Sequence, residues 1–179
     1  DSGSWSHVIS RLLGVLTFAA VVAGFILLTH RAKLWQVVLV CGAVLGMAFA
    51  FLTPPLVGPD EYTHLAKCYR QSSTLLGQSA GITLARMMGR GFHGMLLLGR
   101  LCNLALYLAL AAAAVNIAPQ RLRGIFAGVA LLAQPLQLAG SLSADAAVLG
   151  YLFCFTALCL TLRTRPARWP ETVAAVVLA

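Results

Sequence analysis

Long apolar stretches alternate with short polar or basic turns along most of this chain. The apolar stretches cover about residues 12–29, 34–52, 95–118, 124–140 and 146–162. Each approaches the roughly 20 apolar residues that an α-helix needs to cross the hydrocarbon core of a bilayer. The pattern therefore predicts an all-α, polytopic integral membrane protein, with five spanning helices in a single transmembrane domain over residues 1–179.

The last residues have the features of a further helix start. Pro170 and Glu171 suit the first turn of a helix, because the missing proline N–H costs nothing there and an acid is favoured. Only ten residues follow Trp169, which is too few to span a bilayer. We therefore expect residues 170–179 to begin a sixth spanning helix and the polypeptide to continue beyond them.

Composition supports the same class of protein. The chain is 60% hydrophobic and 10% charged, whereas soluble domains have about 25% charged residues. The net charge of +8 is typical of a membrane protein with basic cytoplasmic loops, and no aromatic-basic motif accompanies it. We expect membrane lipids, and no nucleic acid, as partners. The five cysteines are odd in number and mostly lie in apolar stretches, which favours small buried side chains over disulfides or a zinc site.

The short turns between apolar stretches predict the topology. Residues 30–33, 119–123 and 163–168 carry two, two and three Lys or Arg residues respectively. Because short basic loops stay in the cytoplasm, alternation places residues 53–94 and the break at 141–145 on the outer face. The outer loop over 53–94 also carries four positive charges, but apolar residues separate them, as on an interfacial helix over about residues 81–92.

The outer loop opens with an unusual charged motif. Pro54 and Pro55 end the preceding apolar stretch, and two of the chain's five acids, Asp60 and Glu61, follow side by side. On a helix Asp60 and His64 would share a face, where a carboxylate and an imidazole can hold a divalent cation or share a proton. Helix capping explains one acid well, but explains two acids and a histidine poorly. Charge at a membrane edge is costly, which favours a functional site.

Three further motifs remain open between a structural and a functional interpretation. Ser141-x-Ser143-x-Asp145 suits the cap of a helix or a second part of the same outer site. Arg100 and Asn103 lie one turn apart in an apolar stretch, where an arginine either snorkels to head groups or binds an anionic group. Arg86 and Arg90 would form a basic edge, facing anionic lipid or a substrate phosphate.

These motifs, in this order, resemble a bacterial family of predicted polytopic membrane proteins of unknown function. The resemblance covers about residues 40–162 and rests on Pro59-Asp60-Glu61-x-x-His64, Arg100-x-x-Asn103 and Ser141-x-Ser143-x-Asp145. That family looks related to the GT-C glycosyltransferases, which use polyprenyl-phosphate-linked sugars as donors and carry an acidic pair in their first outer loop. This chain departs from the family in its additional first apolar stretch and in a short loop between Arg70 and Gly81.

The resemblance implies a role for each motif. Asp60 would be the principal catalytic carboxylate with Glu61 beside it, and His64 and Asp145 would support them. Asp60 and His64 are also the candidate ligands of a divalent cation, Mg²⁺ or Mn²⁺. The residues expected to bind the donor phosphate are basic, namely Arg100, Arg86 and Arg90.

The predicted function is a cell-envelope glycosyltransferase in the bacterial inner (plasma) membrane, with its site facing the periplasm or exterior and a polyprenyl-phosphate sugar as donor. One alternative is a transporter or flippase for lipid-linked or anionic solutes, in which the same charges form a relay. Another is a non-catalytic membrane subunit. A broken midplane helix would favour transport, and Gln134-Pro135 is the candidate for such a break.

Overall fold

The computed structural model describes residues 32–58, 60–70 and 76–164, together with the helical residues Phe18, Val21, Val22 and Ile26. Across these residues the fold is all-α. Three helices are long and apolar enough to cross a membrane: α2 (Leu34–Leu52), α5 (Phe92–Ile117) and α8 (Asp145–Leu162). The shorter helices are α3 (Glu61–Tyr69), α4 (Leu76–Met87), α6 (Arg123–Ala130) and α7 (Ala133–Ala139).

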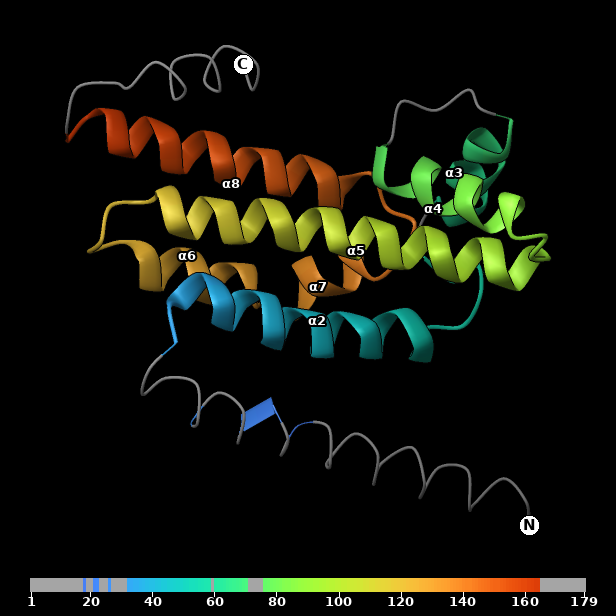
Figure 1. Cartoon of the computed structure of the whole chain (residues 1–179), viewed down its shortest axis with the longest axis horizontal. Coiled ribbons are helices and arrows are strands. Elements are labelled where there is room, and N and C mark those ends of the chain that lie inside the picture. The colour runs from blue at the N-terminus through green and yellow to red at the C-terminus, as the bar shows by residue number, and fades with distance from the viewer. Residues whose placement is uncertain are drawn as a thin grey trace.

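Helix α5 lies at the centre, between α8 on one side and α2 on the other (Figure 1). Its buried side chains, such as Leu104, Leu108 and Val115, pack against α2, α6 and α7 in the main apolar core. Helices α3 and α4 gather at one end of the bundle, where Leu65, Ile82 and Leu96 form a second core. The site described below lies at that same end.

The basic turns lie together at the opposite end. Lys33, at the start of α2, and Arg123, at the start of α6, line one cavity. Arg121 and Arg163 line another, between the turn after α5 and the end of α8. The end that carries α3 and α4 is therefore separated by the length of the bundle from the basic turns, as the predicted alternation requires (Figure 1).

The prediction of one spanning helix over residues 124–140 is wrong. The chain forms two short helices there, α6 and α7, with an extended residue, Leu132, between them. Pro135 explains the break, because a continuous helix would leave the Leu131 carbonyl without its N–H donor and against the proline ring. In the observed fold Pro135 lies in the first turn of α7, where no N–H is needed. The two helices together still return the chain to the site end (Figure 1).

Other boundaries also differ from the prediction. Helix α5 begins at Phe92, three residues earlier than expected, and the short helix of the outer loop covers Leu76–Met87 rather than residues 81–92. Arg90 thus lies beyond the end of α4, so Arg86 and Arg90 do not share a helix face. The predicted helix over residues 170–179, and most of the predicted span over 12–29, lie outside the described residues.

Candidate functional site

The site begins where prolines end helix α2. Pro54 has no N–H, so the carbonyl of Ala50, four residues earlier, lacks its helical donor. Arg100 reaches across from α5 and supplies it, with Nη1 donating to the carbonyls of Ala50 (2.9 Å) and Thr53 (2.8 Å). Nη2 donates to the carbonyl of Pro54 (3.0 Å). Arg100 therefore caps the C-terminal end of α2, where unpaired carbonyls at membrane depth would be costly.

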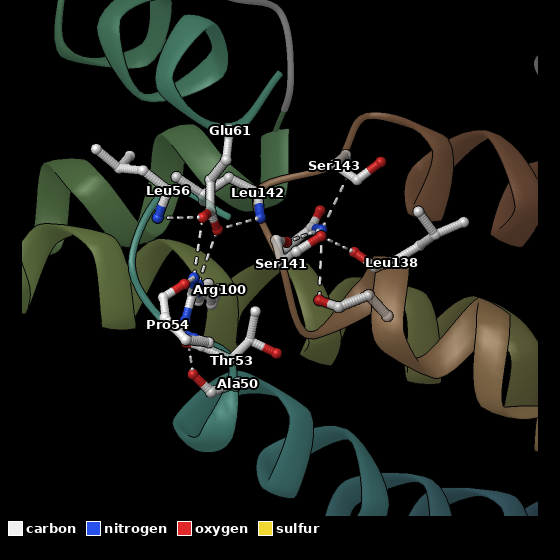
Figure 2. Close-up of polar contacts among 12 residues, drawn as sticks. Ala50, Thr53, Pro54, Leu56, Glu61, Arg100, Leu138, Ser141, Leu142 and Ser143 are labelled. Atoms are coloured by element: carbon white, nitrogen blue, oxygen red, sulfur yellow. Dashed lines mark hydrogen bonds and ion pairs between the residues drawn. The ribbon is translucent and has the colours of Figure 1, made fainter. Parts of the chain in front are cut away.

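The remaining donors of Arg100 bind Glu61. Nε donates to Oε1 at 2.8 Å and Nη2 donates to Oε2 at 2.9 Å, which is the bidentate geometry of a strong ion pair. Both side chains are buried, at 1% exposure for Glu61 and 3% for Arg100. Figure 2 shows the guanidinium between the Glu61 carboxylate and the backbone around Thr53 and Pro54. All five N–H donors of Arg100 are engaged, so the predicted binding of a donor phosphate by Arg100 finds no free donor in this arrangement.

Glu61 also fixes two backbone segments. Its carboxylate accepts the N–H of Leu56 (2.9 Å) and that of Leu142 (3.2 Å), in the break before α8. Burial opposes ionisation, but the hydrogen bond and charge of Arg100, with the two backbone donors, outweigh it and lower the pKa of Glu61. A carboxylate held ionised by an engaged arginine is a poor proton acceptor. In this geometry Glu61 holds two backbone segments in place, and its predicted catalytic role stays a prediction.

Asn103, one turn further along α5, also binds backbone groups. Its Nδ2 donates to the carbonyls of Ser141 (2.9 Å) and Ser143 (3.1 Å), with a longer contact to Ala139 (3.4 Å). Ser143 Oγ in turn accepts the N–H of Asp145 at 3.2 Å, at the start of α8. We refer to Glu61, Arg100 and Asn103 as the polar clamp. It joins the three sequence motifs into one buried cluster.

Asp60 directly precedes Glu61 but has very different surroundings. It is exposed, and its backbone is left-handed with φ 59° and ψ 6°. It precedes α3 but makes no side-chain cap hydrogen bond, so the capping alternative lacks its expected bond. Leu56 has φ 62°, a costly conformation for a leucine. The bonds of Glu61 to Leu56 and to Arg100 hold this loop in place.

His64 and Asp60 do not form a metal site by themselves. The backbone N–H of His64 donates to the carbonyl of Asp60 at 2.9 Å, as expected one turn into α3. His64 Nδ1 is buried without a partner among the described residues. No group of three or more His, Cys, Asp or Glu side chains suited to a metal occurs in the described part of the chain. Mg²⁺ and Mn²⁺ prefer several oxygen ligands, and one carboxylate with one imidazole does not supply them.

The remaining predicted residues lie at the surface of the same end. Arg86 is exposed, donates from Nη1 to the carbonyl of Tyr69 (3.2 Å) and stacks on the Tyr69 ring at 4.9 Å. Arg90 is exposed in the turn after α4, and Asp145 is exposed in the first turn of α8. The bond between Glu61 and Leu142 brings the loop of Asp60 and the break before Asp145 together. Neither acid lines the cavity between these segments, whereas Gly58 and Ser141 do.

Sequence reasoning missed that cavity and the pairing of the two glutamines that line it, since it considered Gln134 only with Pro135 as a possible helix break. Its volume is about 430 Å³, and it lies between residues 53–58 and α7, with Gln134 and Gln137 on one wall. The available signal was two amides three residues apart in an otherwise apolar stretch, since such a pair falls on one helical face.

Comparison with known proteins identifies a family for this chain. A family model described as "Predicted membrane protein (DUF2142)" matches residues 74–179, a range that includes Arg100, Asn103 and the 141–145 break but begins after Asp60. Comparison with curated proteins and with solved structures gives no match. Because the match extends over more than half of the chain, the protein belongs to this family of predicted membrane proteins.

Proposed function

We propose that this protein is a membrane glycosyltransferase resembling the GT-C enzymes, and that it takes a sugar from a polyprenyl-phosphate donor on the outer face of the bacterial plasma membrane. The observation that carries the proposal is the exposed Asp60, held in a left-handed conformation beside the polar clamp. Strained residues that their surroundings over-determine are concentrated at functional sites. The clamp gives the loop the rigidity that a catalytic carboxylate needs.

In this proposal Asp60 acts as the general base. It takes the proton of an acceptor hydroxyl while the acceptor oxygen bonds to the anomeric carbon of the donor sugar. The bond from that carbon to the phosphate oxygen breaks, and polyprenyl phosphate leaves with the bonding electrons. Arg86 and Arg90, both exposed at the same end, would stabilise the negative charge of the leaving phosphate. His64 and Asp145 remain candidates for supporting roles, and no step requires a metal ion.

The direct test uses the purified full-length protein in sealed lipid vesicles. Radiolabelled sugar on a polyprenyl phosphate is supplied to the lumen or to the outside, and covalent transfer to lipid or to added acceptor is measured. The proposal requires that transfer occurs from one side of the membrane only and that it depends on Asp60. A folded wild-type protein that transfers no sugar from a panel of such donors would count against it.

A transporter is the second candidate function, and one observation favours it. The break between α6 and α7 interrupts the helical path beside α5, and interrupted helices are a feature of substrate sites in transporters. Net movement of labelled lipid-linked sugar across the vesicle membrane, with no covalent product, would support transport and exclude the transferase.

A further inference from the structure

Two cavities meet beside the loop that carries Asp60. The polar one, of about 430 Å³, lies between residues 53–58 and α7. The other, of about 560 Å³, runs along the C-terminal half of α2 and is mostly apolar, with Leu45, Phe49 and Leu52 in its wall. The two share Thr53, Val57 and Gln137, so a polar and an apolar cavity adjoin each other there.

The polar cavity offers hydrogen bonds without charge. Gln134, Gln137 and Thr53 line it, and none of their side chains has a hydrogen-bond partner among the described residues. Each primary amide offers two donors and one acceptor, and the threonine hydroxyl offers one donor. Gln134 and Gln137 are exposed and Thr53 is half-buried, so all three side chains are available to a ligand. Such a set of neutral donors and acceptors matches a group that carries several hydroxyls.

The chemistry of the walls excludes a phosphate as the preferred occupant. None of the described residues that line the two cavities is Lys, Arg, His, Asp or Glu. A phosphate placed there would lose its hydration without gaining a cation. The donor-binding arginines of the proposed function, Arg86 and Arg90, line neither cavity.

The apolar cavity indicates that the occupant is a lipid. It follows the end of α2, a helix suited to span the membrane, and its lining is that of an acyl-chain groove. We propose that the adjoining cavities bind a lipid with an uncharged, hydroxyl-rich head group, the head among Gln134, Gln137 and Thr53 and one chain beside Phe49. This inference rests on the proposed function in one respect: such a lipid would be the acceptor whose hydroxyl Asp60 deprotonates.

Photolabelling tests the proposal on the full-length protein in nanodiscs. The probe is glucosyl-diacylglycerol with a diazirine in one acyl chain, and the comparison probe is phosphatidylglycerol with the same chain. We expect the glucosyl probe to label peptides from residues 45–57 or 133–141. The double variant Gln134→Leu/Gln137→Leu should lower this labelling by about 5-fold or more, since a neutral hydrogen bond contributes about 1 kcal/mol. Gln120→Leu, at the opposite end of the bundle, is the matched control and should label like the wild type.

The outcomes separate this inference from the proposed function. Equal labelling by the two probes, or labelled peptides elsewhere in the wild type, overturns the lipid site even if the double variant fails to fold. The Asp60→Asn variant should still take up the glucosyl probe. Loss of transfer in that variant without a mapped lipid site would leave the transferase standing and remove the acceptor site. A mapped lipid site in a protein that transfers no sugar would support the lipid site and count against the transferase.

Discussion

At the scale of single residues, two adjacent acids have opposite surroundings. Glu61 is buried and accepts hydrogen bonds from Arg100, Leu56 and Leu142. Asp60, one residue earlier, is exposed and makes no cap hydrogen bond. A buried and fully engaged carboxylate stabilises structure, whereas an exposed one on a rigid loop is available for chemistry. Substitutions at the two positions should therefore have different kinds of effect.

Replacing Asp60 by asparagine tests the chemical role. The change removes charge but keeps size, and asparagine tolerates the left-handed backbone as well as aspartate does. We expect a folded protein whose sugar transfer falls by about 100-fold or more, as for loss of a general base. Asp145→Asn removes the other exposed acid of the described residues at this end and should cost much less. Unchanged transfer in Asp60→Asn would exclude Asp60 as the base.

Acid should weaken the fold through Glu61. Because its pKa is lowered in the folded state, the ion pair contributes stability at pH values above the ordinary glutamate pKa of 4.5. That contribution is lost as pH falls through the lower folded value. We expect the melting temperature in detergent to be steady from neutral pH to about pH 5 and to fall below it.

Glu61→Gln is the control for that titration. It leaves Arg100 buried without a counter-charge, which typically costs about 3–5 kcal/mol, so its melting temperature should be lower at neutral pH. On acidification the melting temperature of the variant should then fall less than that of the wild type. A steady melting temperature down to pH 3 in the wild type would contradict the buried ion pair.

At the scale of elements, α5 carries a polar stripe whose side chains bind the backbone where other helices end. Arg100, Asn103 and Tyr107 are three and four residues apart, so they lie on one face. Arg100 caps α2, and Asn103 binds the carbonyls that follow α7. Tyr107 is buried and donates from its hydroxyl to the carbonyl of Ala130, at the end of α6, at 3.0 Å. A helix interior that supplies donors to broken neighbours leaves fewer of their terminal carbonyls unpaired.

The contact of α4 with α5 depends on a glycine. A Cβ on Gly81 would collide with the backbone carbonyl of Leu98, which cannot move aside as a side chain would. We expect Gly81→Ala to lower the free energy of unfolding by about 1–3 kcal/mol or more, because overpacking typically costs that much. Gly128→Ala, in α6, is the matched control, because nothing lies within 4 Å of the added methyl group. It should be neutral or stabilising by up to about 1 kcal/mol, and thermal unfolding of both variants measures the difference.

Local pattern predicted the long helices well and the tertiary contacts poorly. The apolar run predicted α2 over residues 34–52, and the structure has the same bounds. The sequence offered Gln134-Pro135 as a candidate break within one spanning helix. It did not predict two separate helices, because a proline in an apolar run leaves open whether the helix kinks or ends. The ion pair joins residues 39 positions apart. Local spacing could place Glu61 and Arg100 near one membrane face, but it could not show that they neutralise each other.

At the scale of the whole molecule, the two ends of the bundle differ in their acids. The three acids of the described residues lie at the clamp end, together with Lys67, Arg70, Arg86 and Arg90. Lys33, Arg121, Arg123 and Arg163 lie at the end opposite the polar clamp. The end that carries Asp60 is also where both cavities of the lipid proposal lie. Short basic turns remain on the cytoplasmic side during insertion. The short basic turns therefore support the proposed orientation, in which the clamp, Asp60 and the cavities face outward.

Single-cysteine labelling tests this orientation. The five native cysteines are replaced by alanine, and one cysteine is placed either at Leu122, in a basic turn, or at Val57, which is 66% exposed in the loop of Asp60. An impermeant maleimide added to intact cells should label Val57→Cys, and should label Leu122→Cys only after the membrane is opened. Sugar transfer or retained melting behaviour shows that each variant is folded. Labelling of Leu122→Cys from outside would reverse the orientation and move Asp60 to the cytoplasm, where a donor on the outer face could not reach it.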